Sequence, residues 1–160
     1  MLVLGKAGTA GTEKGVLPVL RDGVVVATLR ASNWKEAATA VVDDREWVLA
    51  KARRELTGRQ ASDPGGTARL RARPTSRWHS RWEADLEGTP VQGRPEKWWQ
   101  STLRYSVGDR LVAEGGTTGG WWPRPTLRAD DALPPHQQVF LLWLELVLNR
   151  RKQAAAAGAA

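Results

Sequence analysis

The 160-residue sequence contains no cysteine. Disulfide bonds, thiolate nucleophiles and cysteine-ligated metals are therefore excluded. Only two histidines are present, His79 and His136, so a site of three histidines is excluded too. The G-x-S-x-G elbow of serine hydrolases and the P-loop are missing as well. We therefore expect that the protein is not an enzyme, that it has no catalytic residues, and that it binds no metal or cofactor.

A hydrophobic run long enough to span a membrane is also missing. The longest apolar run, Val139–Leu148, contains Glu145 and is shorter than the ~18 residues of a membrane span. The apolar start Met1–Leu4 is followed by Lys6 and does not have the order of a secretory signal. We expect a soluble protein in the cytoplasm, with peripheral attachment to the inner face of the membrane left open.

Aromatic residues are scarce except for tryptophan, since one Phe and one Tyr stand against nine Trp. Tryptophan either packs a broad core or stacks on a flat ligand, and packing is the favoured interpretation. Hydrophobic residues make up 41% and charged residues 26%, which is typical of a folded globular domain. The net charge of +7 favours anionic partners.

Short apolar runs alternate with turn residues through most of the chain. Asp22-Gly23 separates two β-branched runs, which is a strong hairpin signal. Two further hairpins are expected around residues 43–45 and 108–109, whereas residues 57–67 are expected to form a surface loop. Trp98-Trp99 is expected to open another strand. Together these signals predict about nine or ten strands in a closed or nearly closed antiparallel sheet.

The clearest expected strand covers residues 77–87, where apolar and charged residues alternate strictly. Arginines alternate in the same way along the segment just before it. If the two segments pair, their arginines form a basic patch that suits a phosphate group. This candidate anion or lipid site consists of Arg69, Arg71, Arg73, Arg77 and Arg81. It fails if Arg69, Arg71 and Arg73 are buried or ion-paired throughout.

The last part of the sequence predicts a helix from about residue 134 to 152. Two prolines at its start suit a first helical turn, and apolar residues cover nearly its whole circumference, as in a helix buried on all sides. One narrow polar stripe remains: Gln138, Glu145, Asn149 and Lys152. We predict a mostly β fold, a closed antiparallel barrel wrapped around a central apolar C-terminal helix. The alternative places this helix in a crevice between two sheets.

The domain organisation follows from these elements. We expect a flexible leader over residues 1–14, one barrel domain over 15–153 and an Ala/Gly tail over 154–160. Gln138 and Glu145 are the polar residues expected to be buried on the helix. Glu145 is expected to pair with an arginine or to reach solvent through a gap, and its alternative role is a polar contact inside a ligand slot. Glu83 and Asp85 are expected to belong to a solvated face.

The segment 134–144, which ends a meander of Trp-bearing hairpins, resembles the Tubby C-terminal-like superfamily. This superfamily includes LURP-one-related proteins and phospholipid scramblases. Segments 77–82 and 119–123 look like its actinobacterial members of unknown function, and the likeness covers about residues 15–152. The resemblance implies a barrel around a central helix, with phosphoinositide binding or membrane association in the eukaryotic branch. A calcium-binding segment and an acylated cysteine of the scramblase kind are missing.

The favoured function is therefore a non-enzymatic module, monomeric, that binds an anionic lipid or a membrane surface. Nucleic-acid binding is less favoured, because Trp78 and Trp82 alternate away from Arg77 and Arg81. The same alternation argues against a carbohydrate enzyme. A scaffold that binds another protein stays open.

Overall fold

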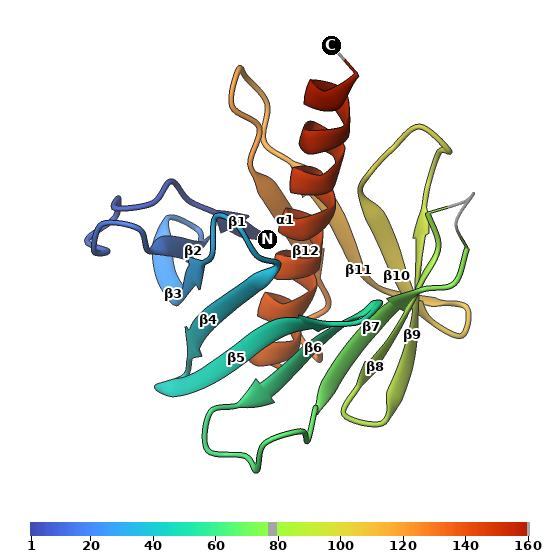
Figure 1. Cartoon of the computed structure of the whole chain (residues 1–160), viewed down its shortest axis with the longest axis horizontal. Helices are drawn as coiled ribbons and strands as arrows, with labels where there is room; N and C mark the ends of the chain where they lie inside the picture. The colour runs from blue at the N-terminus through green and yellow to red at the C-terminus, as the bar shows by residue number, and fades with distance from the viewer. Residues whose placement is uncertain (77–79, 160) are drawn as a thin grey trace.

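In the computed structural model, which describes residues 1–76 and 80–159, twelve antiparallel strands form one closed barrel. Each strand pairs with its neighbours in chain order, and β1 closes the barrel by pairing with both β2 and β12. The predicted closed barrel is confirmed (Figure 1). The strands are β1 (Leu2–Leu4), β2 (Leu17–Arg21), β3 (Val24–Ala31), β4 (Ala37–Val42), β5 (Arg45–Ala52), β6 (Glu55–Gln60), β7 (Leu70–Pro74), β8 (Trp82–Leu86), β9 (Thr89–Pro95), β10 (Leu103–Val107), β11 (Arg110–Thr117) and β12 (Pro125–Ala129).

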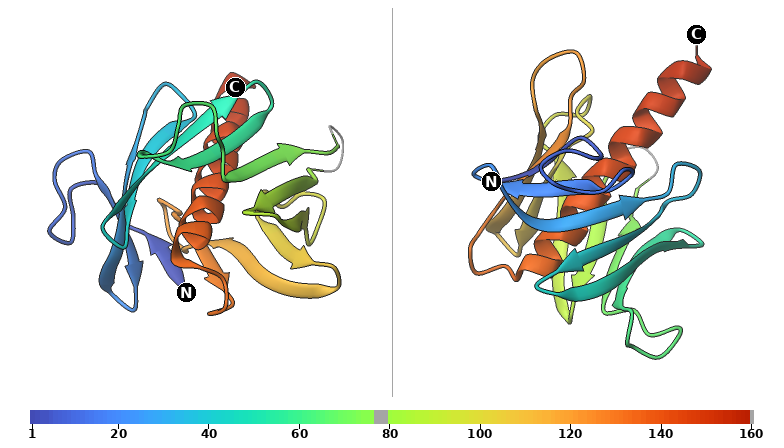
Figure 2. Two further views of the ribbon diagram at one scale, coloured as in Figure 1. Left: turned by 90° about the horizontal axis from the view of Figure 1, so that it is seen from below. Right: turned by 90° about the vertical axis from the view of Figure 1, so that its left-hand side faces the viewer.

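The helix α1 (Pro135–Gly158) runs through this barrel. Figure 2 shows it between the strands, with its C-terminal half emerging at one end. Residues 137–147 of the helix are buried, and side chains from around its circumference join those of the strands in one core. The central apolar helix is therefore confirmed. A chain whose other elements are all strands can bury such a helix by enclosing it in a barrel, because every side of the helix then packs against apolar side chains.

Tight turns of mirror-image type explain the confirmed hairpins. Asp22 and Gly23 have φ of 51° and 79°, and Asp43 and Asp44 have φ of 49° and 59°. Positive φ at both central residues matches the right-handed twist of the flanking strands. Glycine and aspartate tolerate this conformation better than most residues. The predicted hairpins around residues 43–45 and 108–109 form β4–β5 and β10–β11.

The beginning of the chain differs from the expected flexible leader. Leu2–Leu4 form β1, and Leu2 and Leu4 are buried in the core. Only residues 5–16 connect this strand to β2. The strand is three residues long, so its alternation was too short to detect, but the barrel needs it because β12 and β2 would otherwise both be open edges.

The end of the chain differs as well. The helix was expected to stop near residue 152, but it continues through the alanine-rich tail to Gly158. Alanine has the highest helix propensity of all residues, which accounts for the extension. Arg150, Arg151 and Lys152 therefore lie where the helix leaves the barrel and not in its last turn.

Three local predictions are corrected. The loop expected over residues 57–67 begins only after residue 60, because Glu55–Gln60 form β6, and Trp98-Trp99 lie in a loop before β10 instead of opening a strand. The strand expected over 77–87 is observed from Trp82 to Leu86, while residues 77–79 lie outside the described part. Gly58 hides the apolar–polar alternation of β6, because a residue without a side chain takes one of the inward positions. A Cβ added to Gly58 would lie 3.1 Å from Leu49.

The barrel has two different ends because an antiparallel meander places successive connections at alternate ends. We call one the turn end: it carries residues 22–23, 43–44, 61–69, 87–88, 108–109 and 130–134. We call the other the loop end: it carries residues 5–16, 32–36, 53–54, 96–102 and 118–124 and the connection between β7 and β8. The helix emerges at the loop end (Figure 1).

Candidate functional site

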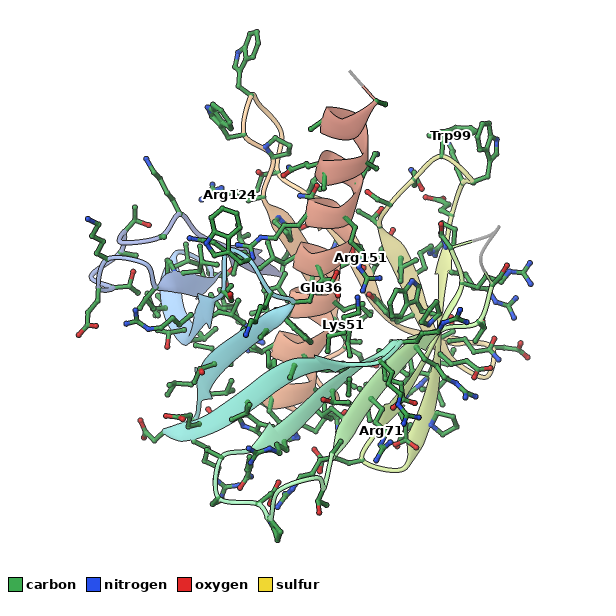
Figure 3. All side chains as sticks on the ribbon, viewed as in Figure 1. Glu36, Lys51, Arg71, Trp99, Arg124 and Arg151 are labelled. Carbon is green, nitrogen blue, oxygen red and sulfur yellow. The ribbon has the colours of Figure 1, made fainter. Side chains whose placement is uncertain are left out.

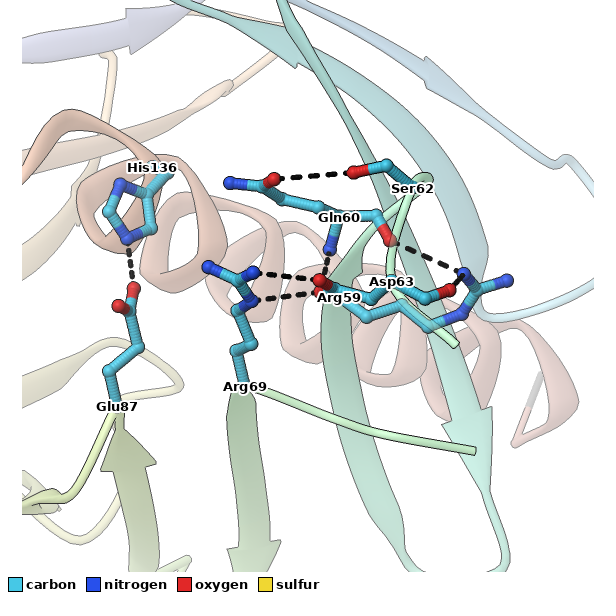
Figure 4. A network of polar contacts seen from close by, with 7 residues as sticks. All are labelled: Arg59, Gln60, Ser62, Asp63, Arg69, Glu87 and His136. Carbon is cyan, nitrogen blue, oxygen red and sulfur yellow. Dashed lines mark hydrogen bonds and ion pairs between the residues drawn. The ribbon is translucent and has the colours of Figure 1, made fainter. Parts of the chain in front are cut away.

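Three of the arginines expected to bind an anion are ion-paired with nearby acids. Figure 4 shows the strongest pair, in which both oxygens of Asp63 accept hydrogen bonds from Arg69 at 2.7 and 2.8 Å. These bonds hold the pKa of Asp63 below its usual value. The three pairs are Arg69 with Asp63, Arg71 with Glu55 at 3.3 Å and Arg73 with Glu83 at 3.2 Å. Since their charges are matched, we remove these arginines from the candidate site.

The other two arginines of that patch do not extend it. Arg77 lies outside the described residues. Arg81 is exposed in the connection between β7 and β8, at the loop end, and not on the strand as expected. The expected basic face therefore does not form on the barrel wall.

A second cluster gathers at the loop end, where five tryptophans are exposed. Trp34, Trp99 and Trp121 are each the middle residue of their loop, between β3 and β4, β9 and β10, and β11 and β12. Figure 3 shows Trp99 at the tip of its loop, on the side where the helix emerges. We call these five the Trp rim: Trp34 (96% exposed), Trp98 (86%), Trp99 (57%), Trp121 (97%) and Trp122 (88%).

The favoured interpretation of tryptophan as core packing is therefore wrong for these five residues. Trp47, Trp82 and Trp143 are buried as expected, and Trp78 lies outside the described residues. Single exposed apolar side chains are common, but exposed apolar side chains gathered in one region of a protein mark interaction sites.

Cations surround the Trp rim. Acids at the same end are few, namely Glu13, Glu36 and Glu96. Among the described residues, Arg53 and Arg54 form no ion pair, and Lys97 lies 5.4 Å from the ring centre of Trp99. The loop-end cations are Lys6, Lys14, Lys35, Arg53, Arg54, Arg81, Lys97, Arg124, Arg150, Arg151 and Lys152.

The largest concentration of these cations lines a cavity of about 430 Å³ beside the helix. Lys51, Arg53, Arg54 and Arg151 line it, together with hydroxyl-bearing residues of the β7–β8 connection. Glu36 is the nearby acid, paired with Arg151 at 2.5 Å and with Lys51 at 3.3 Å (Figure 3). The hydrogen bond from Arg151 is the main cause that lowers the pKa of Glu36. One carboxylate among four cations leaves this cavity positive, which suits a phosphate group.

Contacts between the loops and the helix hold the Trp rim in place. Arg150 donates a hydrogen bond to the backbone carbonyl of Ser32 at 2.9 Å, and the Ser32 hydroxyl accepts one from the backbone N–H of Trp34. In the third loop, the backbone N–H groups of Thr118 and Arg124 bond to acceptors on each other's residue at 2.8 and 2.9 Å. Hydrogen bonds therefore order the backbone at the base of these loops, below their tips.

The two polar residues expected inside the helix are both buried, with Gln138 4% and Glu145 3% exposed. Gln138 accepts a hydrogen bond from Arg21 at 2.9 Å and donates one to the carbonyl of Leu133 at 2.6 Å. Glu145 does not pair with an arginine. Its Oε1 accepts hydrogen bonds from the Tyr105 hydroxyl at 2.6 Å and from the Leu103 N–H at 3.2 Å. Burial raises the pKa of Glu145 to about 7, and these two bonds oppose the rise.

The histidines and the strand carboxylates have structural partners. His136 pairs with Glu87 (Figure 4), and its ring stacks on Trp47, with ring centres 4.6 Å apart. His79 lies outside the described residues. Asp85 accepts a hydrogen bond from the Gly88 N–H at 2.7 Å, and Glu83 pairs with Arg73 at 3.2 Å. The described part of the chain holds no group of three or more acids and histidines arranged for a metal.

Sequence reasoning missed the Trp rim, although a signal was present. Both Trp-Trp pairs stand among residues that favour loops, as in Gly119-Gly120-Trp121-Trp122-Pro123. Adjacent tryptophans point to opposite faces of a strand, so one of the two would face solvent on a one-sided sheet. That pattern favours an exposed loop.

Two further findings concern the chain as a whole. In the described part of the chain, no helix is long and apolar enough to cross a membrane. No protein-family model, no curated protein and no solved structure matches this chain.

Proposed function

We propose that the protein is a non-enzymatic module that binds anionic phospholipid membranes end-on through its loop end. The observation that carries this proposal is the Trp rim, whose tryptophans occupy the tips of three loops and are surrounded by cations. Tryptophan is enriched at membrane–water interfaces, because its ring is apolar and its N–H is polar. Each Lys or Arg near an anionic leaflet adds about 1 kcal/mol of attraction.

The arrangement of the rim favours a membrane over a nucleic acid strand. Binding of a single strand needs a groove that follows the backbone, with aromatic residues spaced along it. Here Trp34, Trp99 and Trp121 stand at separate tips around the emerging helix. A surface of lipid headgroups contacts such tips together and lets each ring enter it.

The positive cavity beside the helix supports the same proposal. Arg53 and Arg54, which form no ion pair among the described residues, present planar guanidinium groups, and such groups bind phosphate oxygens with two hydrogen bonds at once. We propose that the chain belongs with the Tubby C-terminal-like proteins, as the central helix in a closed barrel supports. We also propose that it acts at the inner face of the cytoplasmic membrane.

Co-sedimentation with vesicles tests this function. The vesicles contain phosphatidylcholine with increasing phosphatidylglycerol, at low and at physiological salt. Burying a third of a tryptophan's ~200 Å² contributes roughly 1.5 kcal/mol. We therefore expect Trp121→Ala/Trp122→Ala to weaken binding at least about tenfold. The matched control, Val24→Ala/Leu111→Ala, removes exposed apolar side chains from the turn end and should bind like the wild type.

Binding that rises with phosphatidylglycerol and depends on the Trp rim supports the proposal. Absence of binding at both salt concentrations rejects it. Fluorescence quenching of the protein by an oligonucleotide, together with absence of vesicle binding, would instead favour the nucleic-acid alternative.

A further inference from the structure

A narrow apolar groove lies at the loop end, between the emerging part of α1 and the connection from β3 to β4. Its volume is about 170 Å³. A cavity of about 150 Å³ accommodates a six-carbon hydrocarbon, so this groove has room for a chain segment of similar size. Its apolar lining residues are Trp34, Ala37, Trp143, Val147 and Ala154.

One face of α1 forms a wall along the length of this groove. Trp143, Val147 and Ala154 follow one another at spacings of four and seven residues, which places them close to one line on an α-helix. Trp143 and Val147 are 1% and 3% exposed, so the groove reaches the edge of the core. Ala154 is exposed, and its small side chain leaves the outer end of the groove open.

Two polar contacts hold the β3–β4 connection against this face of the helix. Arg150 donates a hydrogen bond to the carbonyl of Ser32 at 2.9 Å. Arg151 donates two to the carboxylate of Glu36, at 2.5 and 2.7 Å (Figure 3). At about 100° per residue, Arg150 and Arg151 lie on opposite sides of the line that ends at Ala154. The apolar wall therefore lies between two ordered contacts.

The charged residues of the groove carry an excess of positive charge. Its lining includes one acid, Glu36, which pairs with Arg151. Lys35 and Arg150 also line it and form no ion pair among the described residues. Although part of the Arg150 side chain is exposed, burial lowers the pKa of its guanidinium. This cation has therefore lost hydration without gaining a carboxylate, and an anion at the mouth of the groove would compensate for that loss.

We propose that this groove binds one medium-chain fatty acid, with its alkyl chain against Trp143 and Val147 and its carboxylate at Arg150. A guanidinium matches a carboxylate because both groups are planar and can share two parallel hydrogen bonds. The bond from Arg150 to Ser32 uses Nη1, which leaves Nη2 and Nε for the ligand. The volume admits one chain, so a phospholipid with two chains fits less well. This site goes beyond the membrane binding proposed for the Trp rim and does not depend on it.

Calorimetric titration with octanoate tests this proposal in the absence of vesicles. Each enclosed methylene group raises affinity by up to about fourfold, so octanoate should bind at least about tenfold more tightly than butanoate. The uncharged 1-octanol, which has the same chain length, should bind several fold more weakly than octanoate. Equal affinities for octanoate and butanoate, or for octanoate and 1-octanol, would contradict the proposal.

A pair of helix variants tests whether octanoate occupies this groove. Side chains on a helix lean toward its N-terminus, so the ring of Ala154→Phe should extend over the groove and weaken octanoate binding at least tenfold. Ala155→Phe adds the same ring to the neighbouring position, which does not line the groove, and should leave the Kd within about twofold. Both positions are exposed, so both variants should fold. Equal Kd values in the two variants overturn the proposal.

Fluorine NMR of protein that contains 5-fluorotryptophan locates the bound chain. The signals of Trp34 and Trp121 are assigned from Trp34→Phe and Trp121→Phe. Octanoate should shift the signal of Trp34, which lines the groove, and leave that of Trp121, which lies in another loop. Equal shifts of both signals would mean that octanoate contacts exposed tryptophans without a site, and would reject the proposal. Trp121→Ala/Trp122→Ala, expected to weaken vesicle binding, should bind octanoate normally, so the two proposals fail separately.

Discussion

The two ends of the barrel differ in loop length, charge and exposed side chains. At the turn end, four of the five hairpin connections are two-residue turns, and Arg69 is the cation of the described connections. At the loop end the connections are mostly longer, cations predominate and tryptophans occupy the tips. The acids of the turn end are Asp22, Asp43, Asp44, Asp63, Glu87, Asp109, Asp130 and Asp131.

Folding explains the turn end more completely than the loop end. Aspartate tolerates the positive φ of tight turns, and acids lie favourably near the positive N-terminus of the helix. The helix dipole does not explain the cations of the loop end, because Arg150, Arg151 and Lys152 lie before the last turn of the helix, and the Trp rim has no such explanation either. Exposed tryptophan at three loop tips contributes nothing to the core, so binding is the better reason for it.

The largest contrast is between buried and rim tryptophans. Trp143 is 1% exposed, and its ring centre lies 6.0 Å from that of Phe140. Trp143→Ala should lower the free energy of unfolding by about 3–5 kcal/mol, while Trp121→Ala should change it by less than about 0.5 kcal/mol. Urea denaturation measures both. A loss above about 1 kcal/mol for Trp121→Ala would mean that this residue packs against the body of the protein.

Glu145 gives the next largest effect, on the pH dependence of stability. Its pKa is raised from 4.5 to about 7 by burial, so the folded chain holds a proton that the unfolded chain releases between these values. Stability should therefore fall by about 3 kcal/mol as pH rises from about 4.5 to 7, and then level off.

Glu145→Gln sharpens this prediction because an amide retains the acceptor for Tyr105 without the charge. We expect the variant to be more stable than the wild type at pH 8 and to lack this fall. Urea denaturation at pH 5, 6, 7 and 8 measures it. An unchanged pH profile in the variant would assign the dependence to other groups.

Charge removal tests whether the two ends differ in function. Arg53→Gln/Arg54→Gln removes two exposed loop-end cations, and should weaken vesicle binding by about 2 kcal/mol, or about thirtyfold, at low salt. Asp43→Asn/Asp44→Asn removes two turn-end acids at positions where asparagine tolerates the positive φ. This variant should bind equally well or slightly better. Equal losses in both variants would mean that only net charge matters.

The smallest effect is expected on the barrel wall. Arg71→Ala removes an exposed ion pair with Glu55, which contributes less than about 1 kcal/mol. Vesicle binding should be unchanged in a co-sedimentation assay. A clear loss of binding would return the wall arginines to the site.

The sequence predicted the architecture well because strong local signals agreed with it. Asp22-Gly23 between two β-branched runs predicted a hairpin. The apolar residues around the whole circumference of residues 139–148 favoured a barrel that encloses the helix. The three-residue β1 and the alanine extension of α1 carried weaker signals. Barrel closure explains the first, and helix propensity the second.

The binding site was harder to predict because it depends on which residues the fold brings together. Arg69 and Asp63 are six positions apart, and nothing in the alternation of β7 shows that their charges cancel. Trp34, Trp99 and Trp121 are far apart in the chain. They lie at the same end of the barrel only because every second connection of an antiparallel meander lies at that end. Glu145 was expected to meet an arginine, but the core supplies Tyr105 instead.

One measurement tests end-on membrane binding most directly. The chain has no cysteine, so Gly119→Cys at the loop end and Asp109→Cys at the turn end each allow a single spin label. An added Cβ at Gly119 meets open space. On phosphatidylglycerol vesicles, the Gly119 label should be protected from an aqueous relaxation agent and accessible to oxygen, while the Asp109 label stays aqueous. Two aqueous labels on vesicle-bound protein, or a lipid-buried label at residue 109, would contradict the account.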